Sequence, residues 1–97
     1  MTAVATEPAT GSLQALLVEV RSRLTPEQLG MVRGPRQRPG DGVTQEQVAR
    51  ALGISLRHYT AVETEEKQPS LDLLRTLAQV LQLDSVHRVA LFDAVLR

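Results

Sequence analysis

The chain has 97 residues, with eleven basic and eleven acidic side chains and no cysteine. That length predicts one small domain, and the lack of cysteine excludes disulfides and thiolate chemistry. The only imidazoles, His58 and His87, fall in different predicted helices, so a zinc site is not expected. The sequence has neither a membrane-spanning apolar run nor the basic start of a signal peptide, and we expect a cytoplasmic protein without a cofactor.

The N-terminal part of the chain predicts a tail, a helix and a short turn. Residues 1–11 are small and polar, so we expect a disordered N-terminal tail. Leucines and valines then repeat with the spacing of one helical face, which predicts a helix from residue 12 or 13 to about Leu24. Thr25 precedes a proline and a capping-box glutamine, so a single helical turn is expected to end at Gly30.

Residues 31–42 predict a loop, because glycine and proline occupy five of these positions. Three arginines lie in it: Arg33, Arg36 and Arg38. From Arg33 to His58 the chain has five arginines against two acidic residues, whereas residues 59–67 have three glutamates against one lysine. The positive charge of this neutral chain is therefore concentrated in the loop and in the segment that follows it.

Residues 44–63, TQEQVARALGISLRHYTAVE, read as two short helices joined by a tight turn. Thr44 and Gln47 have the spacing of a capping box at the start of the first helix. Gly53 can take the positive φ that ends that helix, and Ser55 is the expected N-cap of the next one. Two short helices in this arrangement form a helix-turn-helix.

Two more helices are predicted after a polar loop at residues 64–68. Pro69 precedes Ser70, the expected cap of a fourth helix at the centre of the core. The predicted inward stripe of that helix is Leu71, Leu74, Ala78 and Leu81. Asp84 is the expected cap of a fifth helix, which has too many apolar residues for one face. The predicted fold is therefore all-α, a compact five-helix bundle over residues 12–97 that contains the helix-turn-helix.

The helix-turn-helix stretch resembles the Cro/phage-repressor family, also called the xenobiotic-response-element (XRE) regulators, whose usual run is close to LTQEELAxxLGVSxxxISxxE. The matching residues are Thr44, Gln45, Glu46, Val48, Ala49, Leu52, Gly53, Ile54, Ser55 and Glu63. Pro69 and Ser70 match the opening of the family's fourth helix. Tyr59, Thr60 and the GPRQRPG loop are more similar to the actinobacterial branch called MmyB-like.

The resemblance implies a sequence-specific DNA-binding transcriptional regulator, or the DNA-binding domain of one, that reads double-stranded DNA with its third helix. MmyB-like regulators carry a ligand-binding domain after this one, so such a domain is an open alternative here. An enzyme is not expected, because no nucleophile, phosphate loop or carboxylate pair has a suitable spacing. The alternative function is a protein-interaction module with weak or no DNA affinity. Zero net charge favours it, as do Glu65 and Glu66, which stand where the family usually has glycine and a basic residue.

The expected DNA-binding residues lie in the loop and in both helices of the motif. By the resemblance, Gln45 would bind a phosphate at the start of the second helix. Arg57 is the strongest base-reading candidate, because a guanidinium group can pair with guanine O6 and N7. The loop arginines would bind flanking phosphates, although a solvated loop is the alternative interpretation. The complete expected set is Gln45, Ser55, Leu56, Arg57, His58, Thr60, Ala61, Arg33, Arg36 and Arg38.

Two further expectations concern packing and assembly. Tyr59 is expected in the core, and the resemblance pairs Glu63 with an arginine of the first helix, either Arg21 or Arg23. A single helix-turn-helix reads only a few base pairs, so two copies on neighbouring half-sites are expected. The surplus apolar residues of helix five predict a homodimer through that helix, with contacts from Phe92, Val95 and Leu96.

Overall fold

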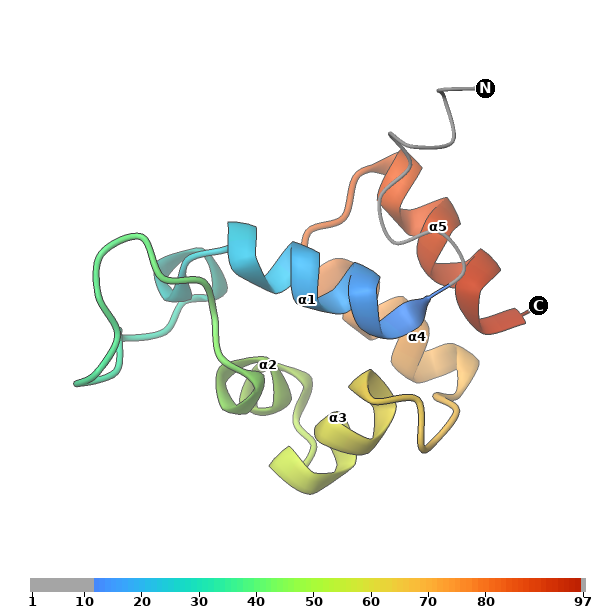
Figure 1. The fold of residues 1–97 in the computed structure, drawn as a ribbon, viewed down its shortest axis with the longest axis horizontal. Coiled ribbons are helices and arrows are strands. Elements are labelled where there is room, and N and C mark those ends of the chain that lie inside the picture. Colours follow the sequence, from blue (N-terminus) through green and yellow to red (C-terminus); the bar gives the residue numbers. More distant parts are fainter. Residues whose placement is uncertain (1–11, 97) are drawn as a thin grey trace.

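The computed structural model describes residues 12–96, and within this range the chain is all-helical, as predicted (Figure 1). The expected N-terminal tail lies outside the described residues. Five α-helices and one 3-10 turn follow in chain order: α1 (Leu13–Arg23), η2 (Pro26–Leu29), α2 (Gln45–Leu52), α3 (Leu56–Glu63), α4 (Leu71–Val80) and α5 (Ser85–Leu96).

Side-chain caps set the starts of the helices where the sequence places them. Thr44 Oγ1 accepts a hydrogen bond from the Gln47 amide at 3.0 Å, and Gln47 Oε1 accepts one from the Thr44 amide at 2.9 Å. Thr25 and Gln28 close the same capping box on η2. Gly53 ends α2 with φ 76°, which glycine adopts without steric cost. Local chemistry therefore determines these boundaries.

The core lies between the five α-helices, and α2 contributes Val48 and Ala49 to it. The predicted stripe of α1 is buried, as are Tyr59 and Val62 of α3. From α4 the buried residues are Leu74, Leu77, Ala78 and Leu81. Leu71, which was predicted to point inward, is instead 52% exposed. At 3.6 residues per turn, Leu71 lies about 70° around α4 from the centre of the buried stripe.

Helix α5 has apolar residues on two opposite faces. Leu91 is fully buried, and Val95, one turn later, packs against the core together with Phe92. These two residues are therefore not surplus to the core, in contrast to the expectation from sequence. The exposed apolar residues are Val86 at 73%, Val89 at 68% and Leu96 at 61%.

The loop at residues 31–42, which we call the arginine loop, returns to the end of α1 through Gly42 and Val43. The Val43 amide donates to the carbonyl oxygens of Arg21 at 3.1 Å and of Leu24 at 3.0 Å. The Val43 side chain is buried, and a Cβ atom built on Gly42 would overlap the Arg21 carbonyl oxygen. This close backbone approach requires glycine.

Replacing Gly42 by alanine tests this requirement. The added methyl group displaces the end of the loop from α1, and the free energy of unfolding should fall by about 1–3 kcal/mol, the usual cost of overpacking. Gly34→Ala is the matched control, because a Cβ there makes only ordinary contact with the side chain of Gln37. Denaturant unfolding of both variants gives the comparison, and equal stabilities would contradict the requirement.

Candidate nucleic-acid interface

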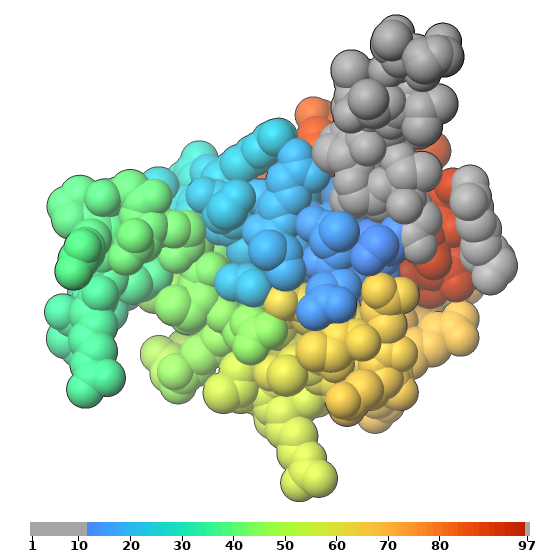
Figure 2. All heavy atoms as spheres, in the orientation of Figure 1, coloured from blue at the N-terminus to red at the C-terminus, as the bar shows by residue number. Residues whose placement is uncertain are grey.

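Helix α3 has a buried face and an exposed face. Its N-cap is Ser55, whose Oγ accepts a hydrogen bond from the His58 amide at 3.0 Å. Tyr59 and Val62 are buried, whereas Arg57 is exposed and Leu56 is 46% exposed. The remaining predicted contact residues of this helix, His58, Thr60 and Ala61, are half-buried. In Figure 2, side chains of this helix (yellow-green) protrude from the surface, so the structure leaves one face of α3 open to a partner.

The Glu63 carboxylate joins α3 to both preceding helices. It accepts hydrogen bonds from Arg21 Nε at 2.8 Å and Nη2 at 2.9 Å, from the Tyr59 hydroxyl at 2.7 Å and from Gln45 Nε2 at 2.8 Å. Of the two arginines expected as partners, Arg21 makes this pair, while Arg23 pairs with Glu19 on the same helix. We call Arg21, Gln45, Tyr59 and Glu63 the Glu63 network.

The charges in the Glu63 network stabilise one another. Burial by itself would raise the pKa of Glu63, but hydrogen bonds from Arg21, Tyr59 and Gln45 outweigh it and lower the pKa. Burial would likewise lower the pKa of Arg21, and its pairing with Glu63 raises it instead. Burial and the hydrogen bond to Glu63 raise the pKa of Tyr59. The network therefore holds an ionised pair and a neutral phenol.

Gln45 is held at the first position of α2 by the same network. Its Nε2 donates to Glu63 at 2.8 Å, and its Oε1 accepts from the Thr60 hydroxyl at 3.5 Å. A primary amide has two N–H groups, and the second N–H of Gln45 has no partner among residues 12–96. The side chain is thus fixed in place with one donor left for an outside acceptor.

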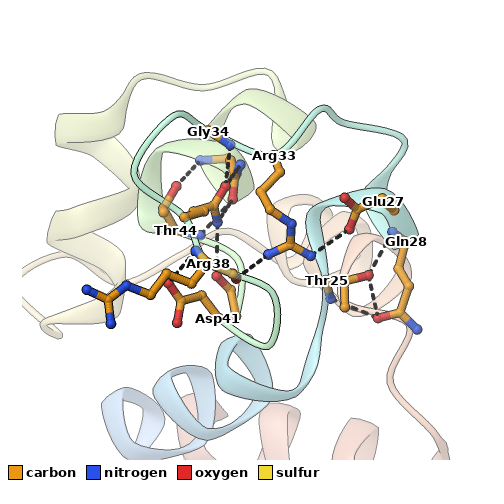
Figure 3. A network of polar contacts seen from close by, with 11 residues as sticks. Thr25, Glu27, Gln28, Arg33, Gly34, Arg38, Asp41 and Thr44 are labelled. Carbon is orange, nitrogen blue, oxygen red and sulfur yellow. Dashed lines mark hydrogen bonds and ion pairs between the residues drawn. The ribbon is translucent and has the colours of Figure 1, made fainter.

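The three arginines of the arginine loop differ in whether their side chains are bonded within the protein or exposed. Arg33 points inward: its Nη1 donates to the Arg38 carbonyl oxygen at 2.7 Å, and its Nη2 to Glu27 at 3.0 Å (Figure 3). Arg36 and Arg38 are exposed, although the backbone amide of Arg38 donates to Asp41 at 2.9 Å. Two of the three predicted phosphate contacts therefore stay at the surface.

Glu65 has a structural role that sequence reasoning missed. Its φ of 67° lies in the left-handed region, which explains why a glycine is usual at this position in the family it resembles. The carboxylate accepts from the Gln14 amide at 3.2 Å and the Ser12 hydroxyl at 3.5 Å, at the N-terminus of α1. A carboxylate there complements the helix dipole. No local sequence pattern indicates this contact, because Glu65 and Gln14 are 51 positions apart.

Residues 12–96 contain no group of three or more histidines, cysteines, aspartates and glutamates placed to hold a metal ion. No helix in that range is long and apolar enough to cross a bilayer. The exposed face of α3 and the surface beside the start of α2 therefore remain the candidate site.

Comparison with known families identifies the segment that carries this site. Residues 41–86 match a family model described as helix-turn-helix, and they include α2, α3 and α4. The match supports the resemblance to the Cro/phage-repressor regulators, a DNA-binding family, while the MmyB-like branch stays a prediction. Searches of curated proteins and of solved structures gave no match.

Replacing Glu63 by glutamine tests the buried ion pair. Arg21 would lose its charged partner, and the free energy of unfolding near neutral pH should fall by about 3 kcal/mol. Glu19→Gln is the matched control, because its pair with Arg23 is more exposed and should contribute less than about 1 kcal/mol. Denaturant unfolding measures both, and equal losses would contradict the role of the Glu63 network.

Glu63→Gln should also change how the free energy of unfolding depends on pH in the acidic range. Because the pKa of Glu63 is lower in the folded chain than its ordinary 4.5, the folded state binds fewer protons than the unfolded state near that pH. This contribution is complete above pH 4.5 and is lost as the pH falls through the lowered folded value. Glu63→Gln should therefore lose less stability on acidification than the parent protein, as unfolding measured across this pH range would show.

Proposed function

We propose that this chain is a sequence-specific DNA-binding transcriptional regulator, or the DNA-binding domain of one, which reads the major groove with α3. The observation that carries the proposal is the exposed face of α3, which the Glu63 network holds rigidly on α1 and α2 within the segment that matches the helix-turn-helix family. A recognition helix needs such a scaffold, because base contacts discriminate only when the backbone contacts set their register.

Each residue of the site has a role in this proposal. Arg57 pairs with guanine through O6 and N7, and Leu56 and Ala61 contact thymine methyl groups. Gln45 donates its remaining N–H to a phosphate oxygen at the start of α2. Further contacts to bases or phosphates come from Ser55, His58 and Thr60. Arg57 and Leu56, which are both exposed, lie in the first turn of α3, where helix-turn-helix proteins contact base edges.

The alternative function is a protein-interaction module with weak DNA affinity, and zero net charge is the feature that favours it. The acidic Glu65 and Glu66 also favour a module with weak DNA affinity. This argument is weaker for Glu65, because its carboxylate is hydrogen-bonded at the N-terminus of α1. Selection of bound sequences from a random duplex pool separates the two functions. Enrichment of a defined site supports the regulator, and no enrichment with no salt-dependent DNA binding supports the module.

Arg57→Ala tests direct base reading. Loss of a bidentate guanine contact should weaken binding to the selected site by about 1–3 kcal/mol and binding to random duplex far less. Arg23→Ala is the matched control, since this arginine is also exposed but lies on α1. Fluorescence anisotropy with both duplexes measures the effect. Equal losses on the two duplexes would assign Arg57 to a phosphate.

We also propose that the regulator binds as a two-fold dimer through α5. Two copies would place their recognition helices on half-sites about one helical turn apart. The exposed Val86, Val89 and Leu96 supply an apolar surface, and Val89 and Leu96 form a shallow groove with Phe92. A following ligand-binding domain, as in MmyB-like regulators, would be an alternative cover for the same surface.

Val89→Glu tests the dimer without disturbing the core, because this side chain is 68% exposed whereas Phe92 packs against the core. The parent protein should sediment as a dimer at micromolar concentration, and Val89→Glu as a folded monomer. Val32→Glu is the control, since Val32 is 89% exposed and lies in the arginine loop. A parent protein that is monomeric with and without DNA would contradict the dimer.

A further inference from the structure

Gln37 is the centre of the hydrogen bonds that shape the arginine loop. Its Oε1 accepts from the Gly34 amide at 2.7 Å, and its Nε2 donates to the Gly42 carbonyl oxygen at 3.1 Å. The same amide pairs with that of Gln47 on α2 in both directions, at 2.9 and 2.7 Å. One side chain therefore joins Gly34, near the start of the loop, to Gly42 at its end and to α2.

The inward direction of Gln37 places its neighbours outward. Gln37 is half-buried, while Arg36 and Arg38 on either side are exposed. Figure 3 shows the Arg38 guanidinium pointing away from the hydrogen-bonded groups, although its backbone belongs to them. The backbone is thus held on both sides of Gln37 while two cationic groups face the solvent.

Arg36 lies beside the predicted phosphate contact at the start of α2. Arg36 lines one groove with Thr44 and Gln47 and a second groove with Thr44 and Gln45. Gln47 is also the capping residue of α2, so the pair with Gln37 fixes the loop to the beginning of that helix. A backbone phosphate bound at Gln45 would have Arg36 next to it, and Arg38 follows two residues later on the same exposed side of the loop.

We propose that Gln37 is a positioning residue, which holds Arg36 and Arg38 against the DNA phosphates that flank the segment read by α3. This inference rests on the proposed function and names an extended contact with the duplex backbone. Arg33 has a different role, because its guanidinium holds the loop together through Glu27 and the Arg38 carbonyl oxygen. Without the Gln37 bonds the same two arginines would lose more conformational entropy on binding phosphate.

The test compares salt dependence of binding to a random-sequence duplex, measured by fluorescence anisotropy. Arg36→Gln with Arg38→Gln should reduce the slope of log K against log salt concentration by about 2, since each phosphate contact contributes about 0.9. Gln37→Leu keeps both arginines but should lower the slope by about 1–2 and the affinity about tenfold at low salt. When Gln37→Leu is added to the double arginine variant, neither the salt slope nor the affinity should fall further.

Two controls separate positioning from loss of structure. Gln37→Asn keeps the amide but shortens its reach, and should act in the same direction with an unchanged unfolding curve. Gln79→Leu makes the corresponding change at an exposed site on α4 and should leave the slope unchanged. Thermal unfolding by circular dichroism shows that each variant is folded before its binding is compared.

The possible outcomes distinguish this inference from the proposed function. A parent protein that binds no duplex overturns the proposed function, and the positioning role with it. A parent protein that binds with a steep slope, unchanged in Gln37→Leu and Gln37→Asn, overturns only the positioning role. The positioning role is also overturned if Gln37→Leu lowers the affinity of the double arginine variant as much as it lowers that of the parent protein. Gln37 would then act through α2 and not through the two arginines.

Discussion

The Glu63 carboxylate is the group on which the rest of the site depends. Helices α2 and α3 have eight residues each, too short to be stable in isolation. Bonds from Arg21 of α1, Gln45 of α2 and Tyr59 within α3 fix their relative placement. A buried carboxylate without these partners would be costly, so one geometry of the three helices is strongly preferred.

The arrangement explains how a chain of zero net charge can leave arginines exposed at the candidate site. Several acidic side chains are engaged by other groups of the protein: Glu63 in its network, Glu27 of η2 with Arg33, and Glu65 at the N-terminus of α1. Arg36 and Arg57 are exposed on the loop and on α3. Net charge alone is therefore a poor guide here, because the field at a surface depends on which charges are paired.

Much of the fold and part of the site could be predicted from the sequence, because those features depend on neighbouring residues. Capping boxes such as Thr44 with Gln47 connect positions three apart, and the positive φ of Gly53 is a property of one residue. Ser55 begins α3 for the same local reason. Its register then follows from helical periodicity, which places Arg57 outward and Tyr59 inward.

Only the tertiary structure decided the contacts between distant positions. Arg21 and Glu63 are 42 positions apart, and the sequence offered Arg23 equally. The same holds for Glu65 at α1, 51 positions from Gln14, and for Gln37 with Gln47 across the loop. The residues next to a glutamine or glutamate in the sequence do not indicate which distant residue it will bond. Packing brings them together, and for the partly buried Arg21–Glu63 and Gln37–Gln47 pairs the cost of leaving a polar group unpaired then favours the bond.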